Sequence, residues 1–429
     1  MRVINNYILG DLDFKSFYQL DPEVLNFVIE ETKNQESQLS LIASESMMMP
    51  WIKYCLSSVL HNRTVEGNIG ARYFPGTVFI DQIERICQRR FEENFRMAFA
   101  NVQPHVASIA NWATILSLVP KMGTIVNMSL KDGGHVSHAL ISSPISNQFN
   151  VVSYCVNPDD GQVNYEEIER LIIKCRPQLV ISGASSYPRH INHELISHIA
   201  HRWGALHLAD IAHVAGLILG NILPKDHVSA DIVTLSTQKT MLGPRGGVIL
   251  CNDSIINRKI SKMVFPGLQG ALMLNSITAK AVCIKYCSTK QFKELMKRVV
   301  FLSRTLANAL REHNIPVVTE GTDTHIVLVD LSKFKFSTKE ISEKLSSVGL
   351  LCNRNYIPND KLRKIPTGIR MGTTILAQRG VEKDDMIELA AVLAKAFHSN
   401  GNDLKPIREF VLRILRERPN RIASCWLPN

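Results

Sequence analysis

A lysine that follows a short apolar run is the residue of this chain best suited to covalent chemistry. The apolar run Ile232–Leu235 leads into Ser236-Thr237-Gln238-Lys239, and a glycine-rich turn follows. A lysine at the end of a buried strand loses hydration of its ammonium group, which lowers its pKa and suits it to form a Schiff base with a carbonyl. Ser236 and Thr237 would offer hydroxyl groups to a phosphate. Because most lysines after strands are structural, this interpretation depends on the surrounding residues.

Asp210 is the second candidate, and it lies one strand–helix unit before Lys239. It follows the apolar run Ala205–Ala209, and His213 comes three residues later. A carboxylate at this strand end is placed to pair with the pyridinium nitrogen of pyridoxal phosphate, which keeps the ring protonated and able to accept negative charge. Taken alone, Asp210 would serve equally well as the N-cap of a helix.

Alternating apolar strands and helices must position these residues. Such alternation predicts an α/β fold with a mostly parallel sheet covered on both faces, and ligands bind beyond the carboxyl ends of its strands. The expected strands are Thr124–Met128, Val151–Tyr154, Leu179–Ser182, Ala205–Ala209, Ile232–Leu235 and Val248–Cys251. The expected helices between them include Ala107–Leu118, Tyr165–Lys174 and His193–Trp203.

The ends of the chain differ from this central part. Asp21-Pro22 predicts the start of a first helix, since Asp is a good N-cap and Pro suits a first turn. After residue 267 we expect one long helical stretch from Leu272 to about Leu310, a strand at His325–Leu331 and a last helix from about Lys405 to Glu417. The predicted parts are an N-terminal arm and helix (1–38), a large domain (39–288) and a small α+β domain (289–429).

Composition and charge argue against several classes of protein. Apolar residues are 45% and charged residues 21% of the 429 residues, as in ordinary soluble proteins, and no apolar run approaches the roughly 18 residues that span a bilayer. The net charge is +10, but its clusters alternate with apolar positions, so solvated helix faces explain them better than a nucleic-acid site. Nine cysteines without a CxxC pair predict free thiols in a reducing compartment and no metal site.

Two longer patterns make the chain similar to the serine hydroxymethyltransferase family. Residues 210–216 read Asp-x-x-His-Val-Ala-Gly, and residues 236–247 read Ser-Thr-x-Lys-Thr-x-x-Gly-Pro-Arg-Gly-Gly. Further matching segments are 41–45 (Leu-Ile-Ala-Ser-Glu), 100–104 (Ala-Asn-Val-Gln-Pro), 133–135 (Gly-Gly-His), 264–267 (Val-Phe-Pro-Gly), 358–360 (Pro-Asn-Asp) and 368–370 (Gly-Ile-Arg). The resemblance implies fold type I of the pyridoxal-phosphate enzymes, with a seven-stranded sheet in the large domain.

The resemblance also implies a set of cofactor residues. Lys239 would bind pyridoxal phosphate covalently, Asp210 would pair with its ring nitrogen and His135 would stack on its ring. Ser185 would hydrogen-bond its phenolate oxygen, and Ser108 would bind its phosphate at a helix start, where free N–H groups favour an anion. The full implied set is Lys239, Asp210, His213, His135, Ser185, Ser108, Ser236, Gln238 and Gly270.

Substrate residues follow in the same way. Arg370 would bind the carboxylate of the amino acid, because the guanidinium fork suits a planar anion, and Ser44 and His213 would line the same pocket. Glu66 would transfer a proton beside the substrate hydroxyl. The implied catalytic residues are Lys239, Glu66, Asp210 and His135. Asn353 matches a folate-side position, and Arg245 would equally well brace its turn.

Several positions depart from the family pattern. Thr64 and Phe74 replace tyrosines, so both phenolic hydroxyls are lost. Gln238 replaces a histidine, Val106-Ala107 replaces Ser-Gly before Ser108, and Ala271 replaces a glycine. Since a hydrogen bond to a charged group contributes about 1.5–3 kcal/mol, these changes predict weaker binding of the cofactor phosphate.

Three functional hypotheses remain open at the sequence level. The first is transfer of the serine hydroxymethyl group to tetrahydrofolate, in a homodimer or homotetramer with shared active sites and with reduced activity. The second is a catalytically impaired member that serves as partner or regulatory subunit of an active paralogue, or that associates with RNA. The third is another fold type I activity, such as threonine aldolase or aminotransferase. The basic pI favours the mitochondrial matrix over the cytoplasm, although the N-terminus has no clear presequence.

Overall fold

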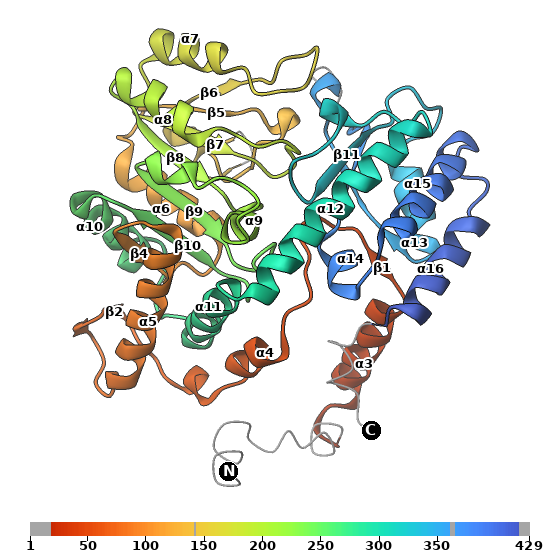
Figure 1. Ribbon diagram of the computed structural model, residues 1–429. Helices are drawn as coiled ribbons and strands as arrows, with labels where there is room; N and C mark the ends of the chain where they lie inside the picture. The colour runs from red at the N-terminus through yellow and green to blue at the C-terminus, as the bar shows by residue number, and fades with distance from the viewer. Residues whose placement is uncertain (1–18, 141–142, 361–364, 420–429) are drawn as a thin grey trace.

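The computed structural model of the chain describes residues 19–140, 143–360 and 365–419. Two lobes are joined along the long helix α12 (Lys290–Glu312), which runs diagonally between them (Figure 1). The larger lobe holds a seven-stranded sheet, and the smaller lobe holds a three-stranded sheet. Helix α3 (Pro22–Glu36) lies below the smaller lobe in the same view.

The large sheet is mostly parallel, as predicted. In spatial order its strands are β4 (Phe99–Asn101), β10 (Gly247–Cys251), β9 (Ile232–Ser236), β8 (Leu206–Asp210), β7 (Leu179–Gly183), β5 (Thr124–Met128) and β6 (Asn150–Tyr154). Strand β10 runs antiparallel to both of its neighbours. All other pairings in this sheet are parallel. The predicted strands are therefore confirmed to within a residue at each end, and β4 is a strand of this sheet that was not predicted.

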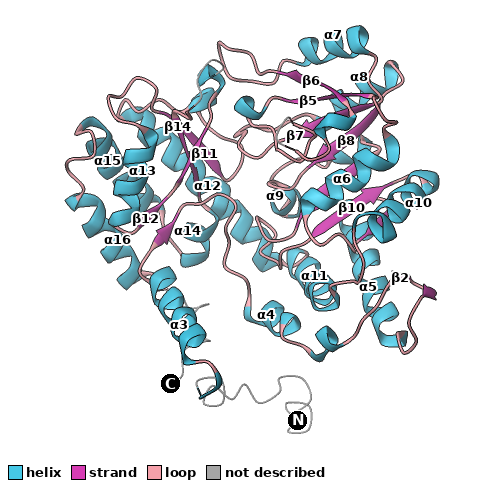
Figure 2. Cartoon of the chain, turned by 180° about the vertical axis from the view of Figure 1, so that it is seen from behind, coloured by secondary structure: helices cyan, strands magenta, loops and turns pink. Residues whose placement is uncertain are grey.

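Helices cover both faces of this sheet. Alternate side chains of each buried strand point to opposite faces, and both sets are buried. On β5, Ile125 packs with α6 (Ala107–Leu118), whereas Val126 packs with α7 (Tyr165–Cys175) and α8 (His193–Arg202). Figure 2 shows the same layers from behind. The remaining helices of the large lobe are α4 (Pro50–Leu56), α5 (Val78–Phe95), α9 (Ala215–Leu219), α10 (Ser254–Lys262) and α11 (Leu274–Cys287).

The smaller lobe packs helices against an antiparallel sheet of β11 (Ile326–Asp330), β14 (Gly368–Gly372) and β13 (Asn353–Asn355). Its helices are α13 (Thr338–Ser347), α14 (Thr374–Arg379), α15 (Lys383–His398) and α16 (Lys405–Glu417). The predicted last helix is confirmed at both ends. Two short strand pairs complete the structure. Strand β1 (Leu39–Ser40) pairs in parallel with β12 (Leu350–Leu351), and β2 (Gly67–Asn68) forms an antiparallel hairpin with β3 (Ala71–Arg72).

Two expectations about helices have different outcomes. The first helix begins as predicted, because the carboxylate of Asp21 accepts a hydrogen bond from the Val24 amide at 3.0 Å. The single helical stretch expected after residue 272 is wrong: α11 ends at Cys287 and α12 begins at Lys290. Thr289 stands between them as an N-cap, accepting from the Phe292 amide at 3.2 Å, a polar signal that apolar periodicity alone does not reveal.

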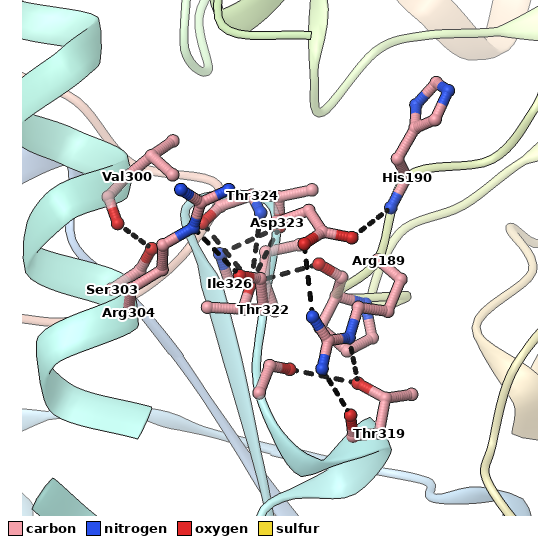
Figure 3. A network of polar contacts seen from close by, with 12 residues as sticks. Arg189, His190, Val300, Ser303, Arg304, Thr319, Thr322, Asp323, Thr324 and Ile326 are labelled. Atoms are coloured by element: carbon pink, nitrogen blue, oxygen red, sulfur yellow. Dashed lines mark hydrogen bonds and ion pairs between the residues drawn. The ribbon is translucent and has the colours of Figure 1, made fainter. Parts of the chain in front are cut away.

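A polar cluster joins the two lobes (Figure 3). The guanidinium of Arg189 donates to Asp323 Oδ1 at 3.1 Å, to the Thr319 carbonyl at 2.6 Å and to Thr319 Oγ1 at 3.2 Å. The His190 amide donates to Asp323 Oδ2 at 3.2 Å, and the Asp323 amide donates to the Pro188 carbonyl at 3.0 Å. Residues 188–190 lie in the loop between β7 and α8. This cluster therefore holds the smaller lobe against the strand ends of the large sheet.

Replacing Arg189 with alanine should lower the free energy of unfolding by about 1–3 kcal/mol, because polar partners at the contact between the lobes lose their donors. The matched control is Arg202→Ala, whose more exposed pair with Glu169 at 3.0 Å should contribute less than about 1 kcal/mol. Urea denaturation of both variants measures the difference. Equal effects of the two substitutions would contradict the role given to Arg189.

Candidate active site

Four of the predicted residues meet because they follow neighbouring parallel strands. Asp210 ends β8, Lys239 follows β9, Ser185 follows β7 and His135 follows β5. These strands stand next to one another in the order β9, β8, β7 and β5. Since the carboxyl ends of parallel strands lie along one edge of a sheet, the four residues form one site there.

Asp210 is the most strongly held of these side chains. Its Oδ2 accepts hydrogen bonds from Asn111 Nδ2 and from His138 Nε2, both at 2.8 Å, and its Oδ1 accepts from the Ala212 amide at 2.9 Å. The side chain is 7% exposed. Burial alone would raise the pKa of Asp210, but the hydrogen bond and charge of His138, with smaller contributions from His135 and Lys239, hold it well below its ordinary value. Asp210 is therefore a carboxylate at neutral pH.

Lys239 faces this carboxylate from the next strand. Burial lowers the pKa of Lys239 to about 8, with the negative charge of Asp210 opposing this shift and the positive charge of Arg370 adding to it. The side chain stays partly accessible to solvent. A lysine with this pKa has a usable fraction of free amine near neutral pH, which nucleophilic attack on a carbonyl requires.

His135 lies beside the pair as a neutral ring. Its Nδ1 accepts from the Ser137 amide at 3.2 Å, and Ser137 Oγ lies 2.6 Å away. Burial lowers the pKa of His135 to about 4, and the neighbouring His138 and Lys239 contribute in the same direction. The two glycines before it pack against protein backbone: a Cβ on Gly134 would lie 2.2 Å from the Met128 carbonyl oxygen. Gly133-Gly134 therefore allow the close backbone packing that positions His135.

Arg370 reaches the site from β14 of the smaller lobe. Its Nη1 donates to the Ser185 carbonyl at 2.6 Å and its Nε donates to Asn353 Oδ1 at 3.0 Å. Burial lowers the pKa of Arg370 to about 10. Within the described part of the chain, no carboxylate forms an ion pair with it. A half-buried guanidinium without a counter-charge is poised to bind an anion.

Ser44 and His213 belong to segments that lie near the strand that carries Arg370. The Gly372 amide donates to the Leu41 carbonyl at 2.7 Å, which places the segment with half-buried Ser44 along the strand that carries Arg370. His213 stacks on His325, with ring centroids 5.6 Å apart and planes at 15°. Burial holds the pKa values of both rings well below the ordinary value, so the pair is neutral.

The predicted phosphate residues lie at the start of α6 and directly before Lys239. Ser108 is in the first turn of α6. The N-cap residue of this helix, Val106, has no side-chain acceptor for the first-turn amides. The hydroxyl hydrogens of Ser236 and Thr237, which we expected to face a phosphate, point to the carbonyls of Ala212 (3.2 Å) and Pro244 (2.5 Å). These two side chains thus stabilise the Lys239 turn.

Gln238 has a side chain that the fold leaves partly unsatisfied. Its Oε1 is buried and has no hydrogen-bond partner in the described part of the chain, while its carbonyl accepts from Ser46 Oγ at 2.7 Å. Buried amide groups are normally paired. This unpaired atom beside Lys239 fits a site that is completed by a ligand.

Glu66 and Gly270 form a separate group near the β2–β3 hairpin. A Cβ on Gly270 would lie 3.6 Å from Glu66 Oε1, and Thr64 and Phe74 are exposed on the same hairpin segment. No hydrogen bond among the described residues links Glu66 or Gly270 to Lys239 or Asp210. Their roles in the site remain predictions.

The family model described as "Serine hydroxymethyltransferase" matches residues 17–393. A serine hydroxymethyltransferase of Wolbachia pipientis wMel is 40% identical over 427 residues, which cover 99% of each chain. Another, from Wolbachia pipientis subsp. Culex pipiens (strain wPip), is 41% identical over 374 residues, covering 87% of this chain and 88% of its own. The chain belongs to the serine hydroxymethyltransferase family.

Family membership also confirms the predicted fold type I. The relatives named above are bacterial, so the comparisons lend no support to the mitochondrial location favoured by the basic pI. None of the helices in the described ranges is both long and apolar enough to cross a membrane. In those ranges there is also no cluster of three or more histidine, cysteine or acidic side chains arranged to hold a metal ion.

Two residues of this serine hydroxymethyltransferase site were not predicted from the sequence, namely Asn111 and His138. Both hold Asp210, and Asn111 Nδ2 also donates to Ser137 Oγ at 2.8 Å. A signal was present in each case: Asn111 is one helical turn after Ser108 on α6, and His138 is three residues after His135. Residues three or four apart on a helix share a face, so a polar residue at 111 was the clearer of the two signals.

The pKa of Lys239 gives a direct test of the pair it forms with Asp210. In the cofactor-free protein, acylation of Lys239 should reach half its maximal rate near pH 8, measured by peptide mass spectrometry. Asp210→Asn should move this midpoint to lower pH, because a negative charge favours the ammonium form and its removal disfavours it. Asp231→Asn is the control, since Asp231 precedes β9 and lies at the opposite end of the strand; a shift as large as that of Asp210→Asn would disprove the pairing.

Proposed function

We propose that this protein is a pyridoxal-phosphate-dependent serine hydroxymethyltransferase, which interconverts serine plus tetrahydrofolate with glycine plus 5,10-methylenetetrahydrofolate. The observation that carries the proposal is the facing pair of Asp210 and Lys239 at neighbouring strand ends, in a chain of this family. The cofactor, when bound, supplies an electron sink that accepts the electron pair released from the α-carbon of the amino acid.

The donor set fits this cofactor. Asp210 is an anion held by three donors, so it would keep a proton on the pyridine nitrogen. Lys239 offers an amine of lowered pKa for the aldehyde. His135 would lie on the ring face as a neutral imidazole, and the first turn of α6 with Ser108 and the amide of Gln238 would take the phosphate.

The amino-acid substrate would be held mainly by Arg370. Its guanidinium is half-buried and has no carboxylate partner in the described residues, so a substrate carboxylate would supply the missing counter-charge. Ser44 and the neutral His213–His325 pair would border the same pocket. Glu66 is proposed to hold or move a proton at the substrate hydroxyl, and that group would complete the site from the hairpin.

Tetrahydrofolate would bind at the rim near His135. Leu130 and Val136 are 38% and 43% exposed, and they flank the Gly133-Gly134-His135 segment with apolar surface that a flat ring system would cover. Asn353, already fixed to Arg370, lies on the strand next to β14 and would contribute a polar contact.

A homo-oligomer with shared active sites is proposed as the working form. Large apolar side chains are exposed along the segment that runs from α4 through the hairpin to the start of α5: Trp51, Tyr54, Val59, Tyr73, Phe74, Val78 and Phe79. An apolar surface of this extent is typical of protein–protein contacts. Sedimentation of the purified protein tests this part of the proposal, and a monomer at micromolar concentration would contradict it.

The central experiment assays the purified chain with serine, tetrahydrofolate and pyridoxal phosphate. We expect formation of glycine, together with a visible absorbance band that is shifted from the band of the free cofactor when the cofactor is added to the protein. Lys239→Arg should abolish both signals, since its guanidinium cannot act as an amine nucleophile. Absence of the band in the unmodified protein would refute the proposed function.

Replacing Arg370 with lysine should raise the KM for serine about 10- to 150-fold, which corresponds to about 1.5–3 kcal/mol for hydrogen bonds to a charged group. The KM for tetrahydrofolate should change less, because Arg370 would reach tetrahydrofolate only indirectly, through Asn353. Arg354→Lys on the neighbouring strand β13 is the matched control and is exposed to solvent. Steady-state kinetics with both substrates decides the outcome; an equal rise in both KM values would argue against a specific carboxylate contact.

A further inference from the structure

Lys280 is a buried charged residue that the proposed chemistry does not use. It lies on α11 and is 1% exposed, and among the described lysines no other is so deeply buried. Its Nζ donates to three carbonyls, those of Val102 (2.8 Å), Pro104 (3.0 Å) and Gly247 (2.9 Å). An ammonium group has three hydrogens and a neutral amine only two, so this arrangement selects the charged form.

The three carbonyls belong to two segments that meet at the start of α6. Residues 102–104 connect β4 to that helix, and Gly247 begins β10. The Gly247 amide donates to the Pro104 carbonyl at 3.1 Å. A Cβ on Gly247 would lie only 2.6 Å from the Val106 carbonyl oxygen, so the two backbones touch. Lys280 thus closes the junction directly behind the first turn of α6, where Ser108 lies.

The same ammonium group also supports the turn that carries Lys239. A Cβ on Gly246 would lie 2.1 Å from Lys280 Cε, so the turn packs directly on the lysine side chain. The Thr237 amide donates to the Gly246 carbonyl at 3.1 Å, two residues before Lys239. One side chain therefore fixes the phosphate end and the lysine end of the site relative to each other.

The charge of Lys280 is only weakly compensated. Burial lowers its pKa to about 8, opposed by Cys87 and Glu84 from α5. Glu84 is itself paired with Arg72, and within the described residues no carboxylate forms an ion pair with Lys280. A positive charge behind a helix N-terminus adds to the partial positive charge of the helix dipole, and both favour an anion at the first turn.

We propose that Lys280 is a positioning residue for the phosphate group of the cofactor: it holds the start of α6 in register with the Lys239 turn and favours the dianion without touching it. This inference rests on the proposed function. It would also account for anion binding at the start of α6, where Val106 and Ala107 provide neither a hydroxyl group nor a glycine.

The test compares two ligands that differ only in the phosphate group. Dissociation constants of pyridoxal phosphate and of pyridoxal are measured by absorbance titration of the full-length, cofactor-free protein. The variant is Lys280→Gln, which keeps two amide hydrogens and removes the charge. We expect the dissociation constant of pyridoxal phosphate to rise at least about tenfold and that of pyridoxal to change less than about twofold. Lys225→Gln is the control, because Lys225 donates to a single carbonyl, that of Asn94 at 3.1 Å, away from the site.

Three results would overturn the inference. Equal changes for both ligands, or no change for either, would leave Lys280 without a specific effect on the phosphate. Loss of cooperative thermal unfolding in both Lys280→Gln and Lys280→Met would assign Lys280 to the fold alone. Failure of the unmodified protein to bind pyridoxal phosphate is a separate outcome, which refutes the proposed function first.

Discussion

The buried carboxylate of Asp210 is the group on which the rest of the site depends. A charge in this position is stable only if hydrogen bonds replace its hydration. Its donors come from α6, from the loop after β5 and from the backbone after β8. The requirement to satisfy one carboxylate therefore fixes a helix and two loops relative to one strand end. The same negative charge keeps the pKa of Lys239 from falling further. The charge of Asp210 therefore also tunes the reactivity of Lys239.

Most of the large sheet could be predicted from the sequence because its strands are buried on both faces. Such strands are mostly apolar runs, as Gly247–Cys251 illustrates, and they leave little ambiguity of type or position. Short edge strands and the pairing of strands could not be predicted in the same way. The three-residue strand β4 and the pairing of β1 with β12 depend on partners far away in sequence, and no local pattern encodes them.

The site was predictable in part for a related reason. Lys239, Asp210, Ser185 and His135 follow strands, and the topology of a parallel sheet brings strand ends together whatever lies between them. Asn111 and His138 were missed because they act through Asp210, and their spacing from Ser108 and His135 is a weaker signal than a strand end. The hydroxyl groups of Ser236 and Thr237 were assigned to a ligand, yet the backbone of the turn needs them. Unsatisfied backbone acceptors compete with ligands for such donors.

The bonds of Arg370 make ligand affinity and the contact between the lobes two aspects of one equilibrium. The guanidinium belongs to the smaller lobe, and its Nη1 donates to the Ser185 carbonyl of the larger lobe. An amino acid that is held through the cofactor near Lys239, with its carboxylate bound to Arg370, would contact both lobes at once. By thermodynamic linkage, whatever separates the lobes then weakens the ligand, and the ligand resists their separation by the same free energy. The loop between Ser185 and His190, which also carries Arg189, thus contacts the smaller lobe and borders the site at the same time.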